Sequence, residues 1–138
     1  MGWWIAAESE LSVRERAERA MELARLSHRR ESIAAAMSHG EQRQLEIAMC
    51  LATEPEVLLL DEPLAGMGVV EAERMVELLL TLKPHHAMLL VEHDMDAVFT
   101  LADRLSVMVN GVVIASGTPV EIRNDATVQA AYLGEEHA

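Results

Sequence analysis

Two short runs of consecutive apolar residues, Val57 to Leu60 and Ala87 to Val91, constrain the fold more than any other feature of the chain. Unbroken apolar runs of this length are typical of strands that are buried on both faces of a parallel sheet. Each run is followed by apolar residues at helical spacing, first over about residues 70 to 82. The order strand, helix, strand, helix predicts parallel strands joined by right-handed crossovers, and therefore an α/β fold.

Two candidate capping boxes predict where the helices before the first strand begin. In each box, Ser12 to Glu15 and Ser38 to Glu41, a serine precedes a glutamate by three residues, so that both side chains can accept backbone hydrogen bonds of the first turn. We expect the first helix over about residues 12 to 26, and the second from Ser38 to just before Pro55. The expected apolar stripe of the second helix consists of Leu45, Ala48, Met49 and Ala52.

The remainder of the chain predicts a hairpin and two short helices. Arg104 to Val109 and Val112 to Ser116 flank Asn110-Gly111, a residue pair typical of a type I′ turn between antiparallel strands. Short helices are expected near residues 119 to 124 and 127 to 133.

Composition excludes several classes of protein. The single cysteine, Cys50, cannot form an intrachain disulfide, and no signal-peptide pattern is present. No apolar run reaches the roughly 18 residues that a membrane-spanning helix needs, so we expect a cytoplasmic protein without direct membrane insertion. The formal net charge of −12 argues against nucleic acid as a partner, because an acidic surface repels a phosphate backbone.

Carboxylates follow the first apolar run directly, as Asp61 and Glu62. The C-terminal edge of a parallel sheet is where such folds usually bind ligands. One acid there could hold Mg²⁺ through water, and its neighbour could orient an attacking water. His93 follows the second run and is expected at the same edge. The plainer alternatives are an acidic loop and a solvated or salt-paired histidine. A metal site formed by Glu92, His93, Asp94 and Asp96 matches none of the stronger ligand spacings.

The start of the second predicted helix, Ser38-His39-Gly40-Glu41, has the features of a phosphate site. It offers a hydroxyl, backbone N–H groups without intrahelical acceptors, and the positive end of a helix dipole. Taken alone, this segment fits plain helix capping better.

The order of these segments resembles that of ABC transporter ATPases, which have a signature motif, a Walker B strand with a catalytic glutamate, and a switch histidine. The matching segments are Met37 to Ala48, Val57 to Pro63 and Leu90 to His93. The resemblance covers about residues 11 to 138 and implies the C-terminal half of a P-loop (RecA-like) α/β domain with part of its helical subdomain. Gly117 to Asp125 and Ala131 to Gly134 look like the C-terminal extension of branched-chain amino acid importer ATPases, with urea importers and lipopolysaccharide exporters as close relatives.

This resemblance implies a role for each candidate residue, with ATP and Mg²⁺ as cofactors. Asp61 would hold Mg²⁺ through water, Glu62 would act as general base, and His93 would bridge the γ-phosphate and the attacking water. Ser38 and Gly40 would contact the γ-phosphate of ATP that is bound by the opposite subunit of a dimer. The implied nucleotide-binding residues also include His39 and Glu41 of the signature, and Gly66 and Gly68 of a loop that couples the two sites.

The resemblance also implies partners and a domain organisation. The partners would be a second ATPase subunit and transmembrane permease subunits, which would hold the chain at the inner face of the cell membrane. There it would power the import of branched-chain amino acids or related substrates. Residues 11–55 would be a helical signature portion, 56–116 a catalytic α/β portion and 117–138 the extension, with residues 1–10 unassigned.

The chain also departs from the family pattern. His39 and Glu41 replace glycine and glutamine of the commonest signature form, without removing a group that the mechanism needs. A Walker A loop requires lysine after glycine, whereas the only lysine, Lys83, follows leucine, and no glutamine precedes the signature. We therefore expect the isolated chain not to hydrolyse ATP. We also expect it to expose apolar strand surface, and so to dimerise, bind a complementary segment or aggregate.

Two other interpretations of the sequence remain open. The chain could be a non-catalytic interaction module that lends only its signature to a partner ATPase, or a remnant without function. A DNA-repair ATPase of the same superfamily is disfavoured by the C-terminal extension.

Overall fold

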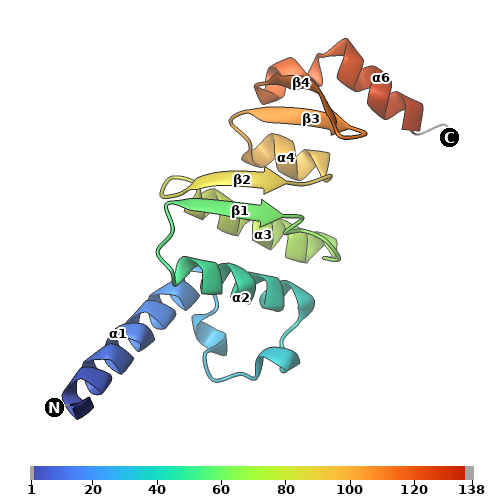
Figure 1. The fold of residues 1–138 in the computed structure, drawn as a ribbon. Helices are drawn as coiled ribbons and strands as arrows, with labels where there is room; N and C mark the ends of the chain where they lie inside the picture. Colours follow the sequence, from blue (N-terminus) through green and yellow to red (C-terminus); the bar gives the residue numbers. More distant parts are fainter. Residues whose placement is uncertain (1, 136–138) are drawn as a thin grey trace. The chain divides into compact units, whose positions relative to one another are not determined.

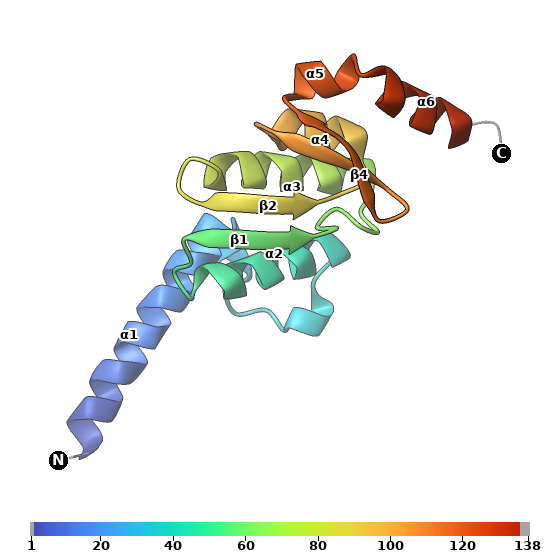
Figure 2. The same ribbon diagram turned by 45° about the horizontal axis from the view of Figure 1, so that its top comes forward.

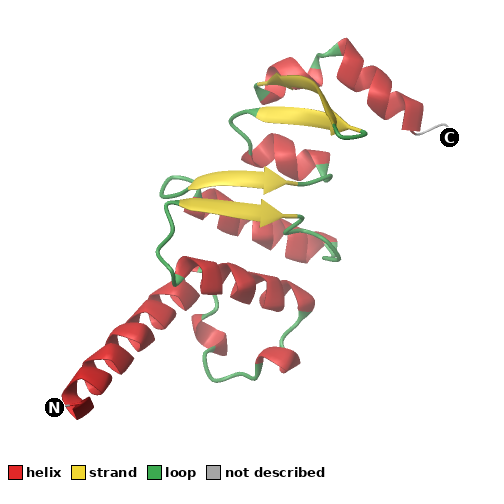
Figure 3. Cartoon of the chain, in the orientation of Figure 1, coloured by secondary structure: helices red, strands yellow, loops and turns green. Residues whose placement is uncertain are grey.

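The computed structural model describes residues 2–135, with the side chains of residues 10–131. The chain forms two compact units, Met1–Glu92 and His93–Ala138, whose helices and strands are shown in Figures 1 and 3. The predicted division into portions 11–55, 56–116 and 117–138 stays a prediction, and its ends at residues 1 and 136–138 lie outside the described residues. In the described part of the chain, no helix is both long enough and apolar enough to span a membrane.

The first unit contains a two-stranded parallel sheet with helices beside it (Figures 1 and 2). Its elements are α1 (Gly2–Leu23), the 3-10 turns η1 (Ser27–Arg29) and η2 (Ala34–Ala36), α2 (His39–Leu51), β1 (Val57–Asp61), α3 (Val69–Leu82) and β2 (Ala87–Val91). β1 and β2 pair in register from Val57 opposite Ala87 to Asp61 opposite Val91. The two predicted strands and their parallel pairing are confirmed.

The first helix does not begin where its capping box predicts. α1 begins at Gly2, because the residues before Ser12 are mostly good helix formers and do not break the helix there. Ser12 is therefore an interior residue and not an N-cap. The helix also ends earlier than residue 26, since Arg25 adopts a φ of 60°. The N–H of Leu26 donates to the carbonyl of Met21 at 2.7 Å, as in a Schellman motif.

The second helix begins where predicted, with Ser38 as the N-cap of a complete capping box. Its buried face differs from the expected stripe, because Ile47 and Leu51 are buried with Ala48, whereas Met49 is 67% exposed. α2 packs against α1 and α3. These neighbours, rather than the apolar pattern alone, decide which side chains of α2 are covered.

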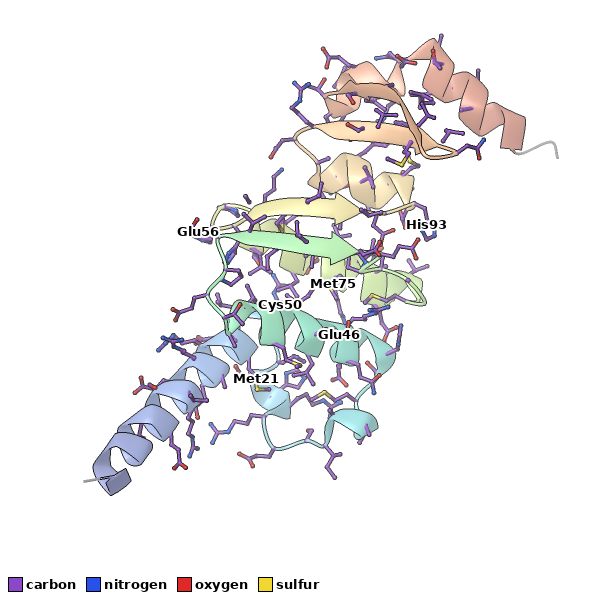
Figure 4. All side chains as sticks on the ribbon, viewed as in Figure 1. Met21, Glu46, Cys50, Glu56, Met75 and His93 are labelled. Carbon is purple, nitrogen blue, oxygen red and sulfur yellow. The ribbon has the colours of Figure 1, made fainter. Side chains whose placement is uncertain are left out.

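The parallel sheet has one covered face and one exposed face. Figures 1 and 2 show α3 along one face, where Leu58 of β1 is buried together with Met75 of α3, which is labelled in Figure 4. The other face carries Val57, Leu59, Leu89 and Val91, all exposed. The prediction that both faces are buried is therefore wrong for the described residues, because α3 covers only one of them. The expected exposure of apolar strand surface is confirmed.

The second unit consists of a short helix, a hairpin and two terminal helices (Figure 1). The elements are α4 (Met95–Leu101), β3 (Leu105–Val109), β4 (Val112–Gly117), α5 (Pro119–Arg123) and α6 (Ala126–Glu135). β3 and β4 pair antiparallel, with a register shift between Val107 and Met108. Asn110 and Gly111 both have positive φ, at 49° and 77°, which confirms the predicted type I′ turn.

A small core of its own holds the second unit together. Val107 of β3, Ile122 of α5 and Val128 of α6 are buried against one another. The guanidinium of Arg123 also lies 4.4 Å from the centre of the Phe99 ring, which is cation–π geometry. The two terminal helices are thereby fixed to α4 and to the hairpin.

Candidate functional site

The acidic pair lies at the C-terminal end of β1, as predicted. Asp61 is the last residue of the strand, and both Asp61 and Glu62 are exposed. Glu62 adopts a φ of 44°, which is uncommon for a residue with a side chain and is often found at functional sites. Its N–H donates to the carbonyl of Val91 at 2.8 Å. The chain therefore turns sharply at Glu62 while the backbone stays bonded to the neighbouring strand.

The turn after Glu62 is also fixed to the end of β2. The carboxylate of Glu92 accepts a hydrogen bond from the N–H of Leu64 at 2.9 Å, and Leu64 is buried. His93, labelled in Figure 4, follows Glu92 as the first residue of the second unit and is exposed. The expected proximity of His93 to Glu62 stays a prediction.

The loop from Ala65 to Gly68 consists of tight turns between β1 and α3. The N–H of Ala65 donates to the backbone carbonyl of Glu62 at 3.1 Å, and Gly66 has a φ of 75°. A side chain at Gly66 would be strained in this left-handed conformation. Gly68 instead is the N-cap of α3 with ordinary φ, and its N–H donates to Glu71 at 3.4 Å. Of the two glycines, only Gly66 is required by the backbone.

The start of α2 is held by reciprocal hydrogen bonds. The N–H of Glu41 donates to the Ser38 hydroxyl at 3.3 Å, and the N–H of Ser38 donates to the Glu41 carboxylate at 2.9 Å. Arg29 also donates to both carboxylate oxygens of Glu41, at 2.6 and 3.2 Å. Hydrogen bonding to Arg29, and then to the Ser38 N–H, holds the pKa of Glu41 below its usual 4.5. The Glu41 carboxylate is thus engaged in holding the helix start.

Two contacts at the start of α2 were not foreseen from the sequence. The Nε2 atom of His39 lies 3.0 Å from the carbonyl oxygen of Ala65. A Cβ added to the buried Gly40 would lie 3.0 Å from Oε1 of Glu71 and 3.3 Å from its Cβ, so a larger residue would require the Glu71 side chain to shift. These partners are far apart in the sequence, and no local pattern indicates that α2 and α3 begin side by side.

The donor groups fit the cofactors that the sequence implies. Mg²⁺ prefers carboxylate oxygens and water, and Asp61 and Glu62 present carboxylates at an exposed strand end. The first N–H groups of α2 have no intrahelical acceptors and suit a phosphate. Among the side chains of residues 10–131, which the structure describes, no group of three or more His, Cys, Asp or Glu could hold a metal ion.

Two family profiles match the chain. One, described as "ABC transporter", matches residues 5–65. The other, described as "Branched-chain amino acid ATP-binding cassette transporter", matches residues 112–138. Together they include the signature segment, the acidic pair and the terminal helices.

Curated relatives show the same similarity. The high-affinity branched-chain amino acid transport ATP-binding protein LivG of Salmonella typhimurium is 48% identical over 101 residues, which are 72% of this chain and 40% of the relative. BraF of Pseudomonas aeruginosa, a protein of the same description, is 42% identical over 104 residues, or 74% of this chain and 41% of the relative. The chain thus spans about two fifths of the length of these relatives.

Solved structures of ATP-binding cassettes have a fold similar to that of this chain. A nucleotide-free ATP-binding cassette from an ABC transporter superposes with a TM-score of 0.79 at 32% identity, over 95% of this chain and 53% of that one. An ATP-binding cassette in its ADP conformation gives a TM-score of 0.79 at 32% identity, over 88% and 50%. The predicted α/β class of a partial ABC ATPase domain is confirmed. The chain belongs to the ATP-binding protein family of ABC transporters, of the branched-chain amino acid type.

Proposed function

We propose that this chain is the signature-bearing part of an ATPase subunit that powers an importer for branched-chain amino acids or related solutes. The observation that carries the proposal is that a single compact unit contains both the capped start of α2 and the exposed Asp61-Glu62 pair at the end of β1. In this proposal the partners are a second ATPase subunit and permease subunits at the inner face of the cell membrane.

The start of α2 would contact ATP that is bound by the opposite subunit. The oxygen of the Ser38 hydroxyl already accepts from the N–H of Glu41, which leaves its hydrogen for donation to a γ-phosphate oxygen. The backbone N–H groups at His39 and Gly40 and the helix dipole would add to this attraction. The Arg29–Glu41 pair keeps the helix start in place.

The end of β1 would carry the hydrolytic groups. Mg²⁺, when bound, would neutralise charge on the phosphates, and Asp61 would hold it through a water. Glu62 would accept a hydrogen bond from the attacking water and take up its proton, while His93 would donate a hydrogen bond to the γ-phosphate. The left-handed backbone at Glu62 supports this assignment, since strain of this kind is often found at functional positions.

The experiment measures phosphate release by the chain alone and in a mixture with an intact relative whose own signature serine has been replaced. We expect no release from the chain alone, because no Gly-Lys pair is available to hold the phosphates. We expect release in the mixture if the chain supplies its signature to the ATP of the relative. Release by the chain alone that Glu62→Gln abolishes would show that another segment holds the phosphates.

Variants at Ser38 separate phosphate contact from helix capping. Ser38→Asp keeps a side chain that caps helices well but sets a negative charge against the phosphate, so release in the mixture should fall at least tenfold. Ser38→Thr keeps both the hydroxyl and the cap and should retain release. Ser32→Asp, at another exposed serine of the same unit, is the matched charge control. Equal release with Ser38→Asp and with the original chain would refute the signature role.

A further inference from the structure

The side chain of His39 connects the start of α2 to the loop that follows the acidic pair. Its Nε2 atom lies 3.0 Å from the carbonyl oxygen of Ala65, across 26 positions of sequence. A carbonyl oxygen only accepts hydrogen bonds, so Nε2 must carry the hydrogen and donate it. The bond therefore requires a hydrogen on Nε2.

The imidazole also lies over the next residue of the loop. A Cβ added at Gly66 would be 3.1 Å from the same Nε2 atom. The ring therefore occupies the space that a side chain at Gly66 would need. Gly66 has a φ of 75°, a conformation that glycine adopts without strain. The ring and the glycine are thus matched, because any larger residue would disturb both the turn and the hydrogen bond.

A second contact lies between the start of α2 and the start of α3. Gly40, the neighbour of His39, lies against the side chain of Glu71, and the same carboxylate accepts from the N–H of Gly68 at the end of the loop. The Ala65 end of the loop is therefore hydrogen-bonded to the first turn of α2 through His39, whereas the Gly68 end is bonded to Glu71, whose side chain lies beside Gly40.

We propose that His39 is a positioning residue, whose Nε2–H holds the Ala65–Gly68 loop in a fixed conformation against the start of α2. Glycine, which stands at this position in the commonest signature form, has no side chain to make such a bond. The loop of this chain is therefore held by a contact that its own signature supplies. Any effect of this contact on two coupled ATP sites rests on the proposed function, whereas the contact itself does not.

The test is amide hydrogen exchange by NMR on the complete chain, without nucleotide. The reporters are the N–H groups of Ala65 and Met67, which donate to the carbonyls of Glu62 and Leu64 at 3.1 and 3.2 Å. In His39→Ala these amides should exchange about threefold to tenfold faster, the range expected for loss of one net hydrogen bond. The amide of Lys83, bonded to Leu79 at the far end of α3, should not change, which would exclude general destabilisation.

Three further variants decide whether the donor itself is responsible. His39→Phe keeps a ring of similar shape without a donor, and should exchange as fast as His39→Ala. His39→Gln restores an N–H donor at similar reach, and should return the exchange rates toward those of the original chain. His85→Ala removes another exposed histidine, beyond the C-terminal end of α3, and should leave Ala65 and Met67 unchanged.

The outcomes that overturn the proposal are distinct. Unchanged exchange in His39→Ala would show that the loop holds its conformation without the bond. Protection in His39→Phe equal to that of the original chain would assign the effect to packing. Failure of the signature role in ATP hydrolysis would leave these exchange rates as they are, so the two hypotheses fail independently.

Discussion

The two faces of the β1–β2 sheet differ sharply in their exposure to solvent, although both carry mainly apolar side chains. On the face covered by α3, Leu58 is 3% exposed, whereas on the other face Leu59 is 73% and Leu89 63% exposed. Residues of the same strand therefore lie in opposite environments because side chains alternate along it. Within the described residues, one face of this sheet is therefore covered by a helix, and the other face is an exposed apolar surface.

A groove between α2 and β1 borders the bare face, which is the exposed sheet face that carries Val57, Leu59, Leu89 and Val91. The lining of the groove includes Met49, Cys50, Val57, Leu59 and Glu46. Figure 4 labels Cys50 and Glu46 on α2. The lining is mainly apolar, which distinguishes it from the polar, densely hydrogen-bonded start of the same helix. The start of α2 is thus polar and hydrogen-bonded, whereas the residues nearer its C-terminal end line an exposed apolar groove.

The largest expected effect on stability belongs to α3, the helix that covers one face of the sheet. Leu79→Ala removes a side chain that is 1% exposed, and should lower the free energy of unfolding by about 3 kcal/mol, from lost transfer energy and the resulting cavity. Urea denaturation measures this change. Leu80→Ala, at the exposed neighbouring position, should cost less than about 1 kcal/mol. Equal losses at the two positions would contradict the burial of Leu79 and the exposure of Leu80.

The bare face should govern self-association. Burial of one leucine contributes about 2 kcal/mol, so Leu59→Lys combined with Leu89→Lys should weaken association more than tenfold. Sedimentation analysis would then show a shift toward the 15.2 kDa monomer. Val120→Lys, at an exposed apolar position of the second unit, is the control. A monomeric original chain, or an equal effect of Val120→Lys, would contradict this expectation.

The two capping boxes give a smaller and more direct comparison. Ser38→Ala should lower the free energy of unfolding by about 1 kcal/mol, because it removes a true N-cap. Ser12→Ala should change it by less than about 0.5 kcal/mol, because Ser12 is inside a helix, where alanine is the better helix former. Thermal unfolding followed by circular dichroism separates the two. A comparable loss at Ser12 would indicate a helix start there in solution.

The smallest effect concerns pH at the start of α2. Because hydrogen bonding to Arg29 and then to the Ser38 N–H lowers the folded pKa of Glu41 below 4.5, its contribution to stability is complete above the unfolded pKa. It is lost as pH falls through the lower, folded pKa. Glu41→Gln should therefore reduce the stability difference between about pH 6 and about pH 3. Glu73→Gln, at an exposed glutamate of α3, should leave more of that difference intact.

Local chemistry explains which features could be predicted. The N-cap at Ser38, the type I′ turn at Asn110-Gly111 and the strand at Val57 each depend on groups within a few residues of one another. The box at Ser12 failed because a capping pattern needs a break in the helix before it, and the preceding residues do not break the helix. The exposure of Met49 could not be predicted, since it depends on where α1 and α3 lie.

The sequence by itself determined the order of the strands and helices, the start of α2 and the positions of Asp61 and Glu62 after a strand, because periodicity and capping act over short distances along the chain. It also determined the family, since the order of its motifs is specific. Only the tertiary structure decided which face of the sheet is covered, that Gly40 packs closely against Glu71, and that His39 reaches Ala65. Those contacts join residues distant in sequence, so they exist only once α2 and α3 have packed together.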